Sequence, residues 1–480
     1  MTGNDRNGSK IFAGIDFATV GLYAFLSVVG LVSIFSATYD PEAAGLFDMS
    51  NLYMKQAVWV GAAWLAGFVL LLSDSRYFHM LAYPAYVLGI LALLAVLLFG
   101  REVNGAKSWF ELGTVRIQPV EFAKIAIALA VARMMSDPSF SIDRAGSLFR
   151  LAALILLPMG IIVAQNDTGS GIVLGSFLFV LYREGLNKWL CIPVLFVALL
   201  FVLSFVFEPA VLLVSFIVLF TVSEAMMNGR WRSRIIFMAS VFFASALLHS
   251  VQLLLGGEML YYQSLMIVSG AAVVVAVIYA FRENLKNIFV IVALFMSGMF
   301  FMPTTDFVFN KILRPHQQNR ILNFLGLIED LKDTGYNVNQ SKIAIGSGGL
   351  AGKGFLEGTQ IKYDFVPEKH TDFIFCTIGE EWGFLGSMVV LGVLCMLIFR
   401  LMKMGDRYAE PFGRVYCYCV ASILLFHVLV NVGMTVGLMP VMGIPLPFIS
   451  YGGSSFVAFT IMLFIAINLD ASTRRIDSGR

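Results

Sequence analysis

The sequence is poor in charge, because Asp, Glu, Lys and Arg make up only 13% of its 480 residues. A water-soluble domain of this length carries about 25% of them. Apolar residues make up 59% of the chain, and the mean hydropathy is +0.82. The net charge is only +2, so no acidic or basic excess indicates a nucleic-acid partner. We therefore expect lipid to surround most of the chain.

Cysteine and histidine are scarce, with five residues of each type. No cysteine pair has the CxxC spacing of zinc or redox sites, and Cys417 and Cys419 point in different directions on a helix. His79, His249 and His427 have no second ligand one helical turn away, so we expect them to pack or form hydrogen bonds. The sequence predicts neither a disulfide framework nor a metal site.

Long apolar runs dominate the rest of the chain. A transmembrane helix needs about 20 mostly apolar residues. Candidate runs are centred near residues 28, 63, 89, 128, 156, 176, 198, 217, 243, 272, 295, 388, 425 and 462. The predicted fold class is therefore an all-α polytopic membrane protein, with about fourteen transmembrane helices and a long extracytoplasmic loop.

Lysine and arginine fall mostly in alternate connections between these runs. The positive-inside rule then predicts that both termini are cytoplasmic. Two outer connections, at about 100–118 and 303–371, are basic exceptions. Long segments follow the rule poorly, and a loop of this length in a compact protein is more often functional.

A glycine-rich run occupies residues 340–354 of the long loop. Its Ser347, Gly348 and Gly349 favour a turn that presents amides to an anion, although a plain flexible turn is an equal alternative. A nucleotide-binding P-loop is excluded by spacing. The first glycine of that motif would fall at Ser347, and Gly354 takes the place of the Ser or Thr that follows Lys353.

An acidic residue, Asp372, stands where the apolar run near 388 begins, in the stretch VPEKHTDFIF at residues 366–375. Thr371 or Asp372 could cap the helix, and position alone favours this role. The alternative is that Asp372 acts as a general base facing a groove. Neighbouring Lys369 and His370 would then hold an anionic substrate or tune the pKa of Asp372.

Other ionisable residues interrupt apolar runs. A charged side chain in lipid costs free energy, so such a residue is by default a candidate for a functional role. Glu121 and Lys124 stand three residues apart, so on a helix they can pair with each other. We expect this pairing rather than direct catalysis. Asp167 lies at a break between two runs, where it caps a helix or lines a cavity.

Prolines break the chain near its end, at residues 440, 445 and 447. They cannot continue a helix, and irregular backbone at membrane depth needs protein or a water-filled cavity around it. We therefore predict a re-entrant outer loop that walls a cavity. Its candidate residues are Pro445, Pro447, Ser450, Gly452 and Gly453.

These stretches, with residues 104–107, 117–124, 165–169, 335–336, 358–360 and 367–375, are distinctive as a set. Together they resemble the family of shape, elongation, division and sporulation (SEDS) proteins. The resemblance is closer to RodA-like than to FtsW-like members, because of residues 320–325 and 358–360. The sequence departs from the family pattern at Ser108, Val120 and Asn166.

The resemblance implies a bundle of ten helices, so about four extra helices fall at 187–310. It divides the chain into N-terminal family helices (1–186), an expanded helical region (187–302), the long extracytoplasmic loop (303–371) and C-terminal helices with the proline-rich loop (372–480).

The resemblance also implies a function, peptidoglycan glycosyltransfer during cell elongation and shape maintenance, in the inner membrane of a bacterium. The substrate would be lipid II, an undecaprenyl-pyrophosphate-linked disaccharide pentapeptide, and the partner a class B penicillin-binding protein. A lipid II flippase and a scaffold without chemistry are the alternatives. Irregular, charge-rich segments on the outer face, rather than at the midplane, favour the enzyme.

Within that family the essential acid maps onto Asp372, which becomes the expected general base. Lys353, Lys369 and Arg116, in this order, are the expected partners of the pyrophosphate. Ser347, Gly348, Gly349, Glu368 and His370 complete the expected substrate site. A Mg²⁺ or Mn²⁺ ion could share the pyrophosphate's charge, although the sequence holds no dedicated carboxylate cage for it.

Overall fold

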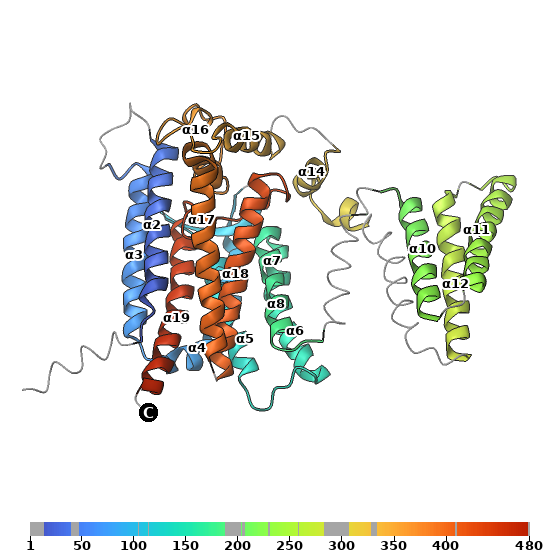
Figure 1. Cartoon of the computed structure of the whole chain (residues 1–480), viewed down its shortest axis with the longest axis horizontal. Coiled ribbons are helices and arrows are strands. Elements are labelled where there is room, and N and C mark those ends of the chain that lie inside the picture. The colour runs from blue at the N-terminus through green and yellow to red at the C-terminus, as the bar shows by residue number, and fades with distance from the viewer. Residues whose placement is uncertain are drawn as a thin grey trace, which may run out of the picture. The chain divides into compact units, whose positions relative to one another are not determined.

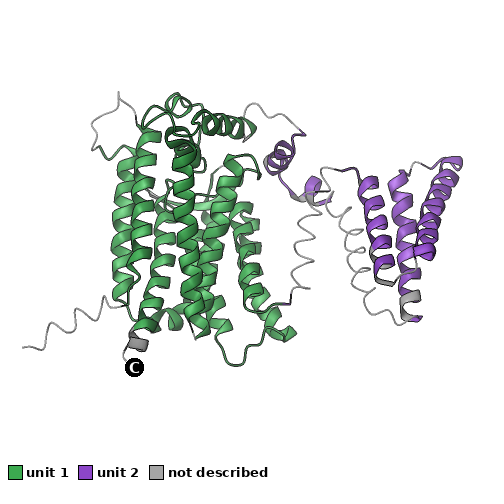
Figure 2. Ribbon diagram, viewed as in Figure 1, with its two compact units in different colours: residues 1–186, 329–480 green, residues 187–328 purple. Residues whose placement is uncertain are grey.

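The computed structural model describes residues 14–39, 48–103, 105–113, 115–187, 203, 207–228, 231–257, 259–282, 307–327, 334–408 and 410–478. Helices dominate this part of the chain (Figure 1). The chain divides into two compact units, which are coloured separately in Figure 2. Unit 1 combines residues 1–186 with 329–480, and unit 2 is residues 187–328.

Unit 1 is a helix bundle with one small sheet. Its long helices are α2 (Phe17–Thr38), α3 (Leu52–Leu72), α4 (Arg76–Phe99), α5 (Pro119–Met135), α6 (Ala145–Ala164), α17 (Ile374–Arg407), α18 (Pro411–Thr435) and α19 (Gly453–Ser478). Its shorter helices are α7 (Thr168–Val173), η1 (Leu174–Ser176), α8 (Phe177–Arg183), α15 (Thr334–Ser347) and α16 (Thr359–Lys362). Three antiparallel strands, β1 (Arg101–Val103), β2 (Ala106–Leu112) and β3 (Val115–Ile117), join α4 to α5.

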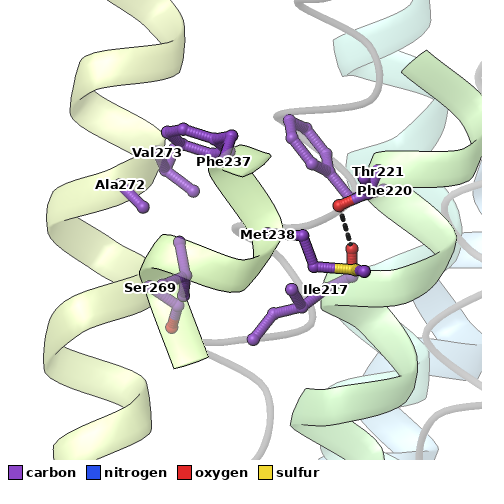
Figure 3. A pocket seen from close by; sticks show the side chains of 9 residues that line it. Ile217, Phe220, Thr221, Phe237, Met238, Ser269, Ala272 and Val273 are labelled. Atoms are coloured by element: carbon purple, nitrogen blue, oxygen red, sulfur yellow. Dashed lines mark hydrogen bonds between the residues drawn. The ribbon is translucent and has the colours of Figure 1, made fainter. Parts of the chain in front are cut away.

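Unit 2 contains helices of the predicted expanded region (187–302) and of the first part of the predicted outer loop. They are α10 (Pro209–Asn228), α11 (Trp231–Leu254), α12 (Tyr261–Arg282), the π-helix η2 (Val308–Ile312) and α14 (Pro315–Phe324). Helices α10, α11 and α12 enclose a cavity of about 20 Å³ (Figure 3). That volume is about one water molecule, and its walls are mostly apolar, so it is no site for a large substrate.

The predicted apolar runs correspond to helical segments, except those near 198 and 295, which lie outside the described residues. Within the described part, nine helices are long and apolar enough to cross a membrane. The run near 176 is one continuous helical stretch, Thr168–Arg183, formed by α7, η1 and α8. The segment predicted as the outer loop, 303–371, contains the helices α14, α15 and α16.

Burial distinguishes the central helices of unit 1 from the peripheral ones. In α18 and α19, 78% of the apolar span is buried within the protein, against 17% in α4. The apolar side chains that α4 leaves exposed suit contact with lipid. Helix α18 packs against α17 and α5, and α19 packs against α3, so α18 and α19 form the core of the bundle.

The start of α2 and the last turns of α19 lie at the same end of unit 1. The carboxylate of Asp16, just before α2, binds Arg400 Nη2 at 2.5 Å and Arg474 Nη2 at 3.5 Å. Arg474 lies in the last turns of α19 and also pairs with Asp470 at 2.8 Å. Helices α15 and α16 lie at the opposite end (Figure 1), which we call the loop end. This arrangement agrees with two termini on one side of the membrane.

Helix α17 is interrupted at Gly383, whose φ is 65° and ψ is −161°. The turn after α15 fits into this break. The amides of Phe384 and Leu385 donate to the carbonyls of Gly349 and Leu350 at 2.9 and 3.1 Å. A Cβ atom on Gly383 would lie 2.2 Å from Gly352 N. The backbones approach too closely for any side chain at this position.

We expect Gly383→Ala to destabilise the protein by about 3 kcal/mol, because it adds strain at a positive φ and a clash with buried backbone. Gly392→Ala in the same helix is the matched control, since a Cβ there meets nothing within 4 Å. Thermal unfolding of both variants in detergent provides the measurement. Equal melting temperatures would contradict the account of the break.

Candidate active site

Asp372 lies in the turn that leads into α17, with its side chain half-buried at the loop end. The N-cap of α17 is Phe373, which makes no side-chain cap hydrogen bond. Neither Thr371 nor Asp372 therefore occupies the predicted N-cap position. Instead, Thr371 Oγ1 donates to Glu368 Oε2 at 2.8 Å, and a Cβ on Gly443 would lie 3.5 Å from Asp372 Oδ2. The carboxylate therefore faces the proline-rich loop.

The proline-rich loop, residues 440–452, has irregular backbone, and Ile444 and most of residues 446–450 are buried. It is hydrogen-bonded to the residues just before Asp372. Ser450 Oγ donates to Thr371 O at 2.7 Å, and Tyr451 N donates to His370 O at 2.8 Å. Asp372 therefore stands beside a fixed wall rather than on a free loop.

Glycines allow this loop to approach its neighbours closely. A Cβ on Gly30 of α2 would lie 2.7 Å from Phe448 O, and one on Gly453 would lie 2.3 Å from the Trp59 ring. Gly452 N donates to Gln56 Oε1 at 3.2 Å. Pro447 is buried within the same turn, and the Pro445 carbonyl contacts α18 (below).

The glycine-rich run does not form the predicted anion-binding turn. Residues 340–347 belong to α15, and Ser347 Oγ donates to Ala344 O at 2.8 Å. The amides of Lys353 and Gly354 donate at 3.0 Å to the carbonyls of Glu380 and Glu381, next to the break in α17. These amides are therefore occupied within the protein.

Glycine does permit a close approach between the backbones of this run and of α17. A Cβ on Gly348 would lie 2.0 Å from Gly379 O, whereas Gly349, with φ 56°, faces open space.

Lys353 forms an ion pair with a fully buried carboxylate. Its Nζ lies 2.7 Å from Glu380 Oε1 and donates to Thr359 Oγ1 at 2.7 Å. Glu380 also accepts from the amides of Gln360 and Ile361 at 2.9 and 3.1 Å. The predicted pyrophosphate partner thus neutralises Glu380 and joins α16 to α17.

Lys369 and His370 are also engaged within the protein. Lys369 pairs with Asp364 and donates to Ile361 O at 2.6 Å. His370 lies edge-on to Tyr451, with ring centroids 5.7 Å apart. Burial lowers the pKa of the His370 imidazole below its ordinary 6.5, against the opposing effect of the nearby Glu368. His370 is therefore neutral at pH 7.

Arg116 is the most exposed of the predicted cations, with 60% of its side chain accessible. It lies on β3 and its Nε binds Glu111 Oε1 of β2 at 2.9 Å. Burial raises the pKa of the Tyr451 hydroxyl, and the nearby Arg116 guanidinium partly opposes this rise. Arg116 is thus within electrostatic range of the residue that contacts His370.

A buried polar network lies between α5 and α18. Lys124 Nζ is 2.9 Å from the Glu121 carboxylate, as the sequence predicted, and 2.9 Å from His427 Nε2. All three side chains are 2% exposed or less. The expectation that His427 forms hydrogen bonds is confirmed.

Asp167 caps α7, because its side chain accepts from Ser170 N at 3.1 Å. Its other oxygen accepts from Gln118 Nε2 at 2.9 Å. In the described part of the chain, no three His, Cys, Asp or Glu side chains are grouped to hold a metal ion.

The arrangement of motifs points to a family, and the family model described as FtsW, RodA and SpoVE cell cycle proteins matches residues 17–215 and 207–475. The chain belongs to the FtsW/RodA/SpoVE family. This confirms the resemblance to SEDS proteins.

Two curated relatives of this FtsW/RodA/SpoVE protein are named peptidoglycan glycosyltransferases. RodA of Treponema pallidum is 32% identical over 466 residues, covering 94% of this chain and 96% of the relative. MrdB of Escherichia coli is 31% identical over 391 residues, covering 81% and 77%. The likeness to RodA agrees with the predicted RodA-like character.

A solved structure described as "Structural coordination of polymerization and crosslinking by a peptidoglycan synthase complex" superimposes with a TM-score of 0.59. It is 25% identical and the match covers 96% of this chain and 98% of that chain. The predicted fold class, a polytopic helical membrane protein of the SEDS type, is confirmed.

Sequence reasoning missed two buried amide side chains of this FtsW/RodA/SpoVE protein, Asn431 and Gln56. Both contact the backbone around Asp372 or the proline-rich loop, and they are 0% and 1% exposed. Each is a polar side chain inside an apolar run, and the same feature of the sequence marks Glu121 as a candidate.

The Lys353–Glu380 ion pair predicts that the effects of substitutions at these two residues on stability are coupled. Lys353→Met leaves a buried carboxylate without its counter-charge and should destabilise the protein by about 3 kcal/mol. Adding Glu380→Gln should restore part of that loss, because the buried charge is then removed. Lys362→Met, at an exposed residue of α16, is the control. Additive effects in thermal unfolding of the double variant would exclude the coupling.

The lowered pKa of His370 predicts a pH dependence of stability. The unfolded chain takes up this proton first as the pH falls, so folding stability decreases from about pH 6.5 down to the lower folded pKa. His370→Gln should remove that part of the decrease. The measurement is the melting temperature of both proteins at about pH 7.5 and about pH 5.5, and parallel decreases would contradict it.

Proposed function

We propose that this protein polymerises lipid II into β-1,4-linked peptidoglycan strands during cell elongation. The observation that carries the proposal is the placement of Asp372, half-buried beside the proline-rich loop at the loop end. The relatives named above, which are peptidoglycan glycosyltransferases over nearly the full chain, support the same activity.

In the proposed reaction Asp372 accepts the proton from the 4-hydroxyl of the acceptor GlcNAc. That oxygen attacks C1 of the donor MurNAc, and the bond from C1 to the pyrophosphate oxygen breaks. Undecaprenyl pyrophosphate leaves with the electron pair. The donor is α-linked and the product is β-linked, so the displacement inverts C1. General-base assistance of this kind contributes about 10²–10⁴ in rate.

Negative charge develops on the departing pyrophosphate, and a cation placed there stabilises the transition state. Lys353 and Lys369 are largely buried and already engaged. Arg116 pairs with Glu111 at the surface, where an exposed ion pair holds weakly. We therefore place Arg116 first among the pyrophosphate-binding candidates, ahead of Lys353 and Lys369.

The polyprenyl chain of lipid II needs an apolar path next to this cation. Helices α4 and α5, with β2, β3 and α19, line a groove of about 500 Å³. Its walls include the small residues Gly89, Ala123 and Ala126. Ile117 of β3 also lines the groove, and it directly follows Arg116 in the chain. We assign this groove to the lipid tail of the substrate.

The membrane side follows from the basic residues. Arg400, Arg407 and Arg474 gather at the end opposite the loop end. By the positive-inside rule we propose that this end, and both termini, face the cytoplasm, with the helices in a bacterial inner membrane. Asp372 then faces outward, where lipid II is displayed. A class B penicillin-binding protein is the proposed partner, because a similar structure is described as a complex for polymerization and crosslinking.

Asp372→Asn tests the proposed base. We expect the purified variant, incubated with lipid II and the penicillin-binding partner, to polymerise at least about 10²-fold more slowly than the wild type. Glu357→Gln, at an exposed residue of the same outer segment, should remain active. Polymer is detected on a gel, and equal melting temperatures show that folding is intact.

Near-normal polymerisation by Asp372→Asn would refute the assignment of the base. A wild-type protein that forms no polymer but exchanges lipid II between vesicle leaflets would instead be a flippase. A protein that does neither would be a scaffold.

A further inference from the structure

Asn431 is a fully buried amide on α18, with 0% of its surface exposed. Burying an amide without partners costs several kcal/mol, so its hydrogen bonds matter. Its Nδ2 donates to two carbonyls from different parts of the chain. One is Asp372 O at 2.8 Å and the other is Ile444 O at 2.7 Å. Both hydrogens of the amide nitrogen are thus used.

Asn431 contributes hydrogen-bond donors to these contacts and no acceptor. Among the residues that the structure describes, Asn431 Oδ1 has no hydrogen-bond partner. The side chain therefore joins the residue that carries the candidate base to the loop that faces it.

His427 lies one helical turn before Asn431 and contacts the next carbonyl of the same loop. Lys124 Nζ has no lone pair, so it donates to His427 Nε2, and the other ring nitrogen carries the hydrogen. His427 Nδ1 then donates to Pro445 O at 3.1 Å. Two consecutive loop carbonyls, Ile444 and Pro445, are thus held by α18.

We propose that Asn431 is a positioning residue, which sets the separation between the Asp372 segment and the proline-rich loop. This inference rests on the proposed function, because the separation matters only if Asp372 meets a substrate there. A displacement of about 1 Å in a reacting group can reduce the rate about 10²-fold. Without Asn431 the two carbonyls lose the one donor that they share.

Two variants separate the donor role from a packing role. Asn431→Leu keeps the branched shape, at a larger volume, and removes the donor, whereas Asn431→Ser keeps a donor and loses volume. We expect Asn431→Leu to lower kcat about 10²-fold with KM changed less than about threefold, and Asn431→Ser to keep the higher kcat of the two. Thr435→Val is the matched control, because Thr435 Oγ1 donates only to Val432 O within α18.

The readouts are initial rates of polymerisation over a range of lipid II concentrations, with the purified full-length protein and its partner. If Asn431→Leu does not fold, Asn431→Ala takes its place, and the order of kcat against Asn431→Ser carries the same comparison. A kcat for Asn431→Leu equal to or above that of Asn431→Ser would overturn the positioning role.

Hydrogen–deuterium exchange distinguishes this inference from the proposed function. In Asn431→Leu we expect faster exchange in residues 370–373 and 446–451, with Thr435→Val unchanged, whatever the protein catalyses. If the exchange is unaltered while the wild type polymerises lipid II and Asp372→Asn does not, the inference fails and the function stands. If the wild type makes no polymer, the function fails by itself.

Discussion

Backbone amides and carbonyls at membrane depth must find partners within the protein, because hydrocarbon offers none. This constraint governs the proline-rich loop, whose prolines prevent helical hydrogen bonds. Two side chains of α18 donate to its carbonyls, Asn431 to Ile444 O and His427 to Pro445 O, and Ser450 within the loop accepts from the Leu446 amide. The same contacts reach the residues around Asp372. The position of the candidate base therefore depends on how that loop satisfies its backbone.

The same constraint explains the break in α17. Gly383 leaves the helical path, and the turn after α15 supplies amides and carbonyls to the freed groups. The Lys353–Glu380 pair lies beside this junction. A glycine-rich run that suggested an anion-binding turn therefore joins two parts of the protein. The sequence named three cations as substrate partners, and burial separates them. Lys353 and Lys369 form ion pairs within the protein, whereas Arg116 is exposed.

Unit 2 is a separate matter. Its helices α10, α11 and α12 form their own small core, and the one cavity described there has room for about one water molecule. Its polar side chains bond mostly within their own helices, as Thr221 does to Ile217 O at 2.7 Å. The residues of the candidate active site all belong to unit 1.

By itself the sequence determined the lipid environment and most of the helices, because hydropathy is a local property, and the family resemblance of its short motifs named Asp372 as the candidate base. It also paired Glu121 with Lys124, since three residues on one helix bring two side chains together. The tertiary structure alone decided that α17 begins after Phe373, that residues 340–347 are helical and that Lys353 binds Glu380. Asn431 could not be assigned earlier, because its two carbonyl partners lie 59 and 13 residues away along the chain. No local pattern records such contacts, and only packing brings these groups together.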